Sequence, residues 1–218
     1  VWTQAIQRWP NLRLWHNGGE TPYVKDGLER LGITPDQLVP PCNHLQAHTL
    51  LVPSFASHFG HPSMANIAWL ERFWDPQGPE AAGSAQAGGA GQRLWFGRPG
   101  SVQRAVMAEQ GWSQSTHAPL LQQTSINAQL AQVRQAGLVI APHGAAMANL
   151  LAAAPGTDVI ELVNPAYQPP YFEGLIRRRQ LRHRKVEAGP PPLPLQEWLY
   201  AGPLAFPIDL GADASAAA

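Results

Sequence analysis

Cysteine is nearly absent from this sequence, since Cys42 is the single one among 218 residues. A lone cysteine cannot form an intramolecular disulfide, so nothing in the chain requires an oxidising compartment. Cys42 follows two prolines and has no activating motif around it, so we expect no role as a thiol nucleophile. Long apolar runs are absent too. No stretch approaches the about 20 residues needed to cross a bilayer, and no integral membrane segment is predicted.

Charged residues are also scarce, at 14% of the chain, and they balance to a net charge of zero. A general nucleic-acid binder or a protein of anionic membrane surfaces would show a strong basic excess, so both classes are excluded. Hydrophobic residues make up 44% of the chain, which is enough for a core. The length fits one large domain or two small ones.

No DxD pair is present that could hold a divalent metal, because the aspartates are isolated at positions 26, 36, 75, 158, 209 and 213. His58 and His61 stand three residues apart, but Gly60 and Pro62 rule out a regular helix there and no carboxylate or cysteine is close in sequence. We therefore predict a loop facing a cleft at these histidines, and neither a metal nor a cofactor.

The most informative stretch is Gly137–Pro165. Its apolar run Leu138–Ile140 predicts a strand buried on both faces, ending at Pro142. A turn follows at His143, and the apolar spacing after it predicts a helix that Pro155-Gly156 ends. A second apolar strand, Asp158–Val163, carries Glu161 in its middle.

The turn in this strand, turn, helix, strand unit is a candidate anion site. Backbone N–H groups and the helix dipole at a helix start attract a phosphate without any metal. Gly144 and Ala145 leave room for it, and His143 could add a hydrogen bond or a charge. The alternative is an ordinary buried crossover whose small residues only allow close packing, since the sequence has no GxGxxG.

The remaining pattern alternates strands and helices. Strands are predicted at 12–15, 48–52, 93–97 and 182–186, and helices at 21–32, 62–74, 99–110, 124–134 and 171–179. The glycine-rich stretch 75–92 predicts a flexible loop, and the Pro/Ala-rich tail 189–218 predicts disorder.

Arg98 and Arg104 follow a strand, where a planar guanidinium can bind a diphosphate through two hydrogen bonds; the alternative is a solvated surface pair. The basic residues at 177–185 are interpreted as a solvated face; the alternative is a site for phosphate or a polyanionic acceptor.

The segment Ala141–Leu162, APHGAAMANLLAAAPGTDVIEL, resembles the signature of glycosyltransferase family 61: an HGA motif, an asparagine at Asn149, a Pro-Gly turn and a strand holding Glu161. Upstream, Arg98, Arg104 and Glu109 are similar to the family's Arg, Arg and Asn-Glu, although Ala108 stands where the family has Asn. Gln129 lies where the family has a glutamine before the HGA strand. The similarity covers residues 48–187.

This resemblance implies an α/β, GT-B-like fold with two Rossmann-type parallel-sheet units and a cleft at the carboxyl ends of the strands. Residues 1–62 would form an incomplete acceptor-side unit and residues 63–188 the donor-binding unit. It also implies transfer of a sugar from a nucleotide-diphosphate donor, as substrate and not cofactor, to an acceptor hydroxyl, with inversion and without metal. The donor-binding residues it implies are Arg98, Arg104, Gln129, His143, Gly144, Ala145, Asn149 and Glu161. The catalytic base is sought among His58, His61, Glu20 and Asp26.

Two alternatives stay open. Val1 is not a methionine, so we interpret the chain as a fragment or a processed product. If its base is missing, the chain would be a non-catalytic nucleotide-sugar-binding remnant; if the ligand is lost too, it would be an α/β scaffold. By analogy with bacterial relatives, a glycan acceptor and a role in polysaccharide biosynthesis are expected, in the cytoplasm or peripheral to the membrane.

Overall fold

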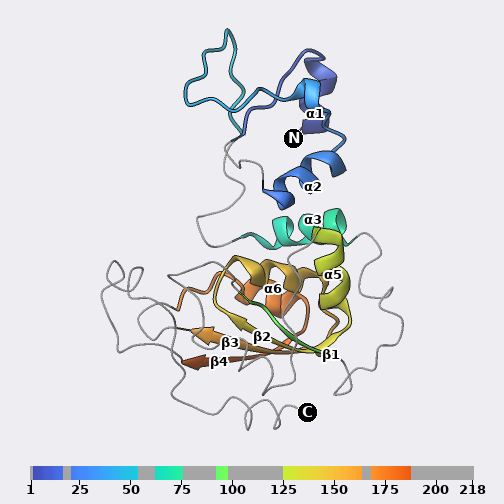
Figure 1. The fold of residues 1–218 in the computed structure, drawn as a ribbon, viewed down its shortest axis with the longest axis vertical. Helices are drawn as coiled ribbons and strands as arrows, with labels where there is room; N and C mark the ends of the chain where they lie inside the picture. The colour runs from blue at the N-terminus through green and yellow to red at the C-terminus, as the bar shows by residue number, and fades with distance from the viewer. Residues whose placement is uncertain are drawn as a thin grey trace. The chain divides into compact units, whose positions relative to one another are not determined.

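The structure is a computed structural model, and it describes residues 2–16, 21–53, 62–75, 92–97, 125–163 and 168–187 (Figure 1). The chain divides into two compact units. The first comprises residues 1–55 with 124–126, and the second comprises residues 56–123 with 127–218. No helix within the described ranges is long and apolar enough to cross a lipid bilayer.

The first unit is helical in its described part, with α1 (Trp2–Arg8), α2 (Pro22–Arg30) and the 3-10 helix η1 (Pro35–Gln37). Extended backbone at Thr21 precedes α2, and Pro22 fits the first turn because its missing N–H would have no partner there. Gly32 follows the helix at a φ of 68°, a left-handed conformation that favours glycine. The predicted helix at 21–32 is therefore confirmed.

The two strands predicted in this unit are wrong. In place of a strand at 12–15 there is one isolated parallel bridge between Leu14 and Leu38. Residues 48–52 form a bend and irregular chain, with Leu50 66% and Val52 76% exposed. A short apolar run becomes a strand only where a neighbour pairs its backbone and covers a face, and the described residues provide neither here. The described part of the first unit thus contains no second parallel sheet.

The second unit is built on a four-stranded, all-parallel sheet in the order β1-β2-β3-β4. Its strands are β1 (Gln92–Trp95), β2 (Ala136–Pro142), β3 (Asp158–Val163) and β4 (Arg182–Glu187). All four were predicted, and the sheet with its helices confirms the α/β class. The strand order runs without reversal, so the described sheet has no topological switch point of the kind that often marks a ligand crevice.

Helical segments connect the consecutive strands: α5 (Ile126–Arg134), η3 (Ala145–Ala152) and α6 (Glu173–Arg178). Right-handed crossovers between sequentially ordered parallel strands put their connections on one face of the sheet. Figure 1 shows α5 and α6 on the same side of the strands. Helix α3 (Met64–Trp74), capped by the Ser63 hydroxyl, packs on η3 and α6 as a further layer. The predicted helix at 99–110 lies outside the described residues.

The core of this unit is formed by strand and helix residues together, among them Trp95, Leu130, Ile140, Leu150 and Ile160. Strands β2 and β3 are buried on both faces, as their continuous apolar runs predict. In contrast, β4 carries exposed Arg182 and Arg184 and is an edge strand of the described sheet.

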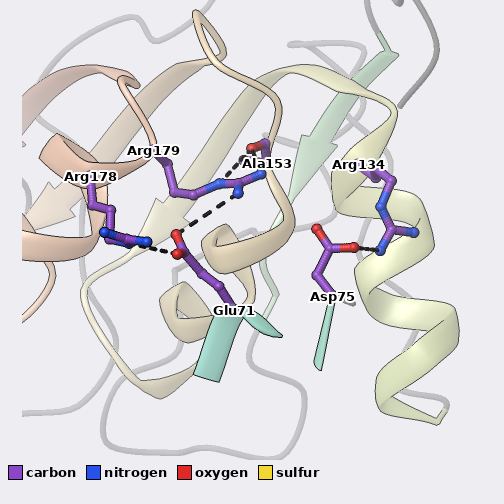
Figure 2. A network of polar contacts seen from close by, with 6 residues as sticks. All are labelled: Glu71, Asp75, Arg134, Ala153, Arg178 and Arg179. Carbon is purple, nitrogen blue, oxygen red and sulfur yellow. Dashed lines mark hydrogen bonds and ion pairs between the residues drawn. The ribbon is translucent and has the colours of Figure 1, made fainter. Parts of the chain in front are cut away.

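The C-terminal half of α3 is fixed by ion pairs (Figure 2). Glu71 lies between two arginines from the end of α6, and its carboxylate pairs with Arg178 at 2.5 Å and Arg179 at 3.8 Å. Arg179 also donates from Nε and Nη2 to the carbonyl oxygen of Ala153, at 3.1 and 2.7 Å. Because its side chain is only 6% exposed, the solvated-face interpretation is wrong for Arg179. Burial lowers the pKa of Arg179, against the raising effect of Glu71.

A second ion pair joins the end of α3 to the end of α5. Arg134 Nη2 donates to Oδ1 of Asp75 at 2.6 Å (Figure 2). Asp75 is buried and Gln92 belongs to β1, so the predicted loop at 75–92 is wrong at its two end residues. Residues 76–91 and the predicted tail lie outside the described residues.

Candidate functional site

The turn between β2 and η3 has the arrangement that the sequence predicts, strand, turn and helix. His143 follows the last residue of β2, and its N–H donates to the Leu162 carbonyl at 2.8 Å, which extends the pairing with β3 by one residue. Gly144 is buried and Ala145 is exposed at the first position of η3. The segment is a 3-10 helix of eight residues, which corrects the predicted α-helical type.

The start of η3 presents backbone donors. The Met147 N–H is used within the turn, where it donates to the Gly144 carbonyl at 2.9 Å. For the N–H groups of Ala145 and Ala146, no acceptor is found among the described residues. Unsatisfied amides at a helix start carry partial positive charge and can bind an anion.

Next to this turn, Glu161 joins two histidines on one face of the sheet. Glu161 is level with Ala141 on β2 and with Lys185 on β4. Side chains alternate along a strand, so His143, two residues beyond Ala141, and His183, two residues before Lys185, project from the same face as Glu161. We call His143, Glu161 and His183 the histidine–glutamate cluster. It runs diagonally across the sheet, from His183 on β4 through Glu161 on β3 to His143 after the end of β2.

Both carboxylate oxygens of Glu161 are engaged in this cluster. Oε1 is hydrogen bonded to Nδ1 of His143, and Oε2 lies 2.8 Å from Nε2 of His183. Glu161 is only 2% exposed. Burial by itself raises the pKa of this carboxyl, but the hydrogen bonds and charges of the two histidines outweigh it and lower the pKa of Glu161 to about 2. The carboxylate is therefore ionised at neutral pH, and it is paired with both histidines.

The segment before α6 covers this cluster. The ring of His143 lies 5.7 Å from that of Tyr171 and 5.5 Å from that of Phe172, and the residue is 9% exposed. Lys185, opposite Glu161 in the register, donates instead from Nζ to Glu173 of α6 at 3.1 Å. The imidazole of His143 is thus confined by aromatic rings on one side and a carboxylate on the other.

Two other predicted donor residues meet nearby in the fold. Asn149, the fifth residue of η3, is buried and donates from Nδ2 to Oε1 of Gln129 on α5 at 3.0 Å. Gln129 lies beside the buried stripe formed by Leu130 and Val133, as its helical spacing predicts. This hydrogen bond ties η3 to α5.

The remaining predicted residues lie outside the described residues or in the first unit. Arg98, Arg104, His58, His61 and Glu20 lie outside the described residues. Asp26 lies on α2, and its Oδ2 accepts a hydrogen bond from the Ile126 N–H at 2.8 Å, within the first unit. A carboxylate used in this way is a structural acceptor.

His183 is the cluster member that sequence reasoning missed. Its position in an alternating, largely basic strand is typical of a solvated face, and only the register of β4 against β3 brings it to Glu161. Placing it would have required knowing that His183 is level with Val159, two residues before Glu161.

The described ranges contain no group of three or more His, Cys, Asp or Glu side chains arranged to hold a metal ion. A cavity of about 540 Å³ lies in the first unit, lined by α2 residues such as Val24 and Leu28 and by residues after the helix such as Ile33. None of the predicted donor-binding residues lines it.

Comparison with protein-family models and with curated protein sequences finds no match for this chain. The resemblance to glycosyltransferase family 61 stays a prediction.

Proposed function

We propose that the turn at His143 binds the diphosphate of a nucleotide sugar and that the chain acts as a glycosyltransferase. The observation that supports this most is the position of His143. Its imidazole is hydrogen bonded to the buried carboxylate of Glu161. Two and three residues later in the sequence, the amides of Ala145 and Ala146 have no acceptor among the described residues. Backbone N–H groups beside a fixed imidazole suit an anion with several oxygens.

The proposed reaction is a direct displacement. A base takes the proton of the acceptor hydroxyl, whose oxygen attacks the anomeric carbon while the bond from that carbon to the diphosphate oxygen breaks. The configuration at the anomeric carbon inverts, and the bonding electrons leave with the nucleoside diphosphate. Donors fixed in advance around that leaving group stabilise the negative charge that grows on it, so a metal is not required by this scheme.

Other residues enter the proposal with separate roles. Arg98 and Arg104 would contact the diphosphate, as the family resemblance implies. Gln129 and Asn149 would act together, since their hydrogen bond fixes η3 against α5. The base would be His58 or His61, and a GT-B-like arrangement of acceptor-side and donor-side units belongs to the same proposal.

The experiment is thermal unfolding with added uridine diphosphate or guanosine diphosphate, in the presence of a chelator. We expect one of the two nucleotides to raise the unfolding temperature of the wild-type chain, because a ligand that binds only the folded state stabilises it. His143→Ala should abolish the shift. His48→Ala, which removes an exposed histidine from the first unit, is the matched control and should retain it.

Turnover is tested separately, by release of free nucleotide from a nucleotide sugar when an acceptor alcohol is added. A thermal shift without turnover would support a donor-binding remnant. Absence of both responses would contradict the proposal and favour a scaffold. A thermal shift that survives in His143→Ala would contradict the assignment of the diphosphate to this turn.

A further inference from the structure

We propose that Glu161 and His183 are positioning residues, which hold the ring of His143 with a proton on Nδ1 so that its doubly protonated form donates from Nε2–H to a bound diphosphate. The contact with the diphosphate depends on the proposed function, whereas the state of the His143 ring can be tested without any ligand. The sequence had suggested Glu161 as one of the donor-binding residues, and His183 had no assigned role.

The first step of the argument is the chemistry of the acceptor. An ionised carboxylate only accepts hydrogen bonds, so an imidazole nitrogen that contacts it carries the proton. Oε1 of Glu161 contacts Nδ1 of His143. This assigns a proton to Nδ1. A contact between His143 and a donor substrate then goes through Nε2, which donates to a phosphate oxygen when the ring carries a second proton.

The second step is the role of His183. A buried carboxylate is stable only when several donors satisfy it, and Glu161 is 2% exposed. Nε2 of His183 supplies the second hydrogen bond, at 2.8 Å to Oε2. With one oxygen held from β4 and the other from the end of β2, the carboxyl plane cannot rotate freely. His183 therefore acts on His143 through Glu161.

The third step concerns the neighbouring charged groups. Lys185 is level with Glu161 but pairs with Glu173 of α6. Arg182 and Arg184 project from the opposite face of β4, and Arg182 pairs there with Asp158. The rings of Tyr171 and Phe172 adjoin His143. The hydrogen bonds from the two histidines therefore fix the orientation of the Glu161 carboxylate.

The test begins with the free, full-length chain labelled with ¹⁵N. Long-range ¹H–¹⁵N correlation spectra of the histidine rings, assigned with His143→Ala and His183→Ala, show which nitrogen carries the proton. We expect a proton on Nδ1 of His143 and on Nε2 of His183. In Glu161→Gln, the amide can accept from one imidazole but turns an N–H toward the other, so at least one ring should change its protonated nitrogen.

Binding of uridine diphosphate or guanosine diphosphate, whichever stabilises the wild-type chain, gives the second readout. Loss of a charged acceptor typically weakens a contact by about tenfold or more, so Glu161→Gln should raise the Kd by about that factor. His183→Ala should raise it by a smaller factor. Arg184→Ala, the next residue on the opposite face, is the control and should leave the Kd unchanged. The Kd of Glu161→Gln should also follow a different pH profile from that of the wild type.

A proton on Nε2 of His143 with none on Nδ1 in the wild-type chain would overturn the inference. So would a Glu161→Gln spectrum with unchanged histidine rings, or wild-type nucleotide affinity in Glu161→Gln while His143→Ala loses binding. If Glu161→Gln does not fold, the His143 ring in His183→Ala decides, since a ring unchanged there contradicts the role of His183. If the wild-type chain binds neither nucleotide, the proposed function fails, and the spectra still decide whether Glu161 positions His143.

Discussion

Arg134 at the end of α5 donates to Asp75, the residue that follows the last turn of α3, at a distance of 2.6 Å. The pair is not fully satisfied. Oδ2 of Asp75 and Nε of Arg134 are both buried, and neither has a hydrogen-bond partner among the described residues. The pair therefore joins two helices, while its unmade hydrogen bonds reduce what it contributes to the free energy of unfolding.

Arg134→Met should destabilise the second unit by about 3 kcal/mol, because it leaves the Asp75 carboxylate buried without its cation. Asp75→Leu should cost less, since the Arg134 side chain is 23% exposed and can reach water. The double variant Asp75→Leu with Arg134→Met should be more stable than the sum of the single effects predicts. Urea denaturation of all three variants measures this. Strict additivity would contradict the coupling, and Asp158→Asn, in an exposed pair, is the surface control.

Arg179→Met tests the buried arginine at the end of α6. The change removes two hydrogen bonds to the Ala153 carbonyl and leaves Glu71 with one arginine partner. We expect a loss of about 2–4 kcal/mol in the free energy of unfolding, because a carbonyl and part of a carboxylate lose buried donors. Arg177→Met, at an exposed neighbouring position, should change little. Equal effects of the two substitutions in chemical denaturation would show that Arg179 is not a structural link.

The stability of the second unit should fall steeply in acid because of Glu161. Its pKa in the fold is about 2, below the ordinary value of 4.5, so the ionised carboxylate stabilises the fold above pH 4.5. That contribution, about 3 kcal/mol, is lost as the pH falls from 4.5 towards 2. Urea denaturation between pH 6 and pH 2 should therefore show a smaller dependence on pH in Glu161→Gln than in the wild type. Parallel curves for the two chains would contradict this, and Glu173→Gln, at an exposed carboxylate, is the control.

The hydrogen bond between Asn149 and Gln129 should be visible as a coupling energy. Asn149→Ala is expected to cost about 1–2 kcal/mol and Gln129→Ala about 1 kcal/mol, since Asn149 is the more buried of the two. The double variant should cost less than the sum of the two. A double-mutant cycle by thermal or urea unfolding measures the difference. A coupling energy of zero would show that η3 is fixed to α5 by packing alone.

Much of the second unit could be predicted from the sequence because its signals are local. The largely apolar runs 138–142 and 158–163 predict buried central strands, and Pro155-Gly156 predicts a turn. The apolar run at 48–52 also predicts a strand, yet its side chains are exposed. A strand needs a neighbouring strand to pair with, and the local residue pattern does not show whether one is present.

The candidate site was predicted as a set of residue types but not as a set of contacts. His143 and Glu161 stand within one motif, whereas their link to His183 depends on strand register, which a pattern of alternating residues cannot specify. The wrong prediction of a solvated Arg179 also arose because a residue pattern does not show tertiary packing. Three consecutive arginines are typical of a solvated face, and only the packing of α6 against η3 buries the third.

Strand β4 is an edge of the sheet that the described residues form. An edge strand offers unpaired amides and carbonyls to any extended chain that meets it, which is how domain swapping and amyloid addition begin. Arg182, Arg184 and Lys185 line this edge, and a second copy of β4 brought alongside would bring like charges together. A chain with threonine at all three positions would keep its fold but lose this protection, and we would expect it to associate with itself in a concentration-dependent manner.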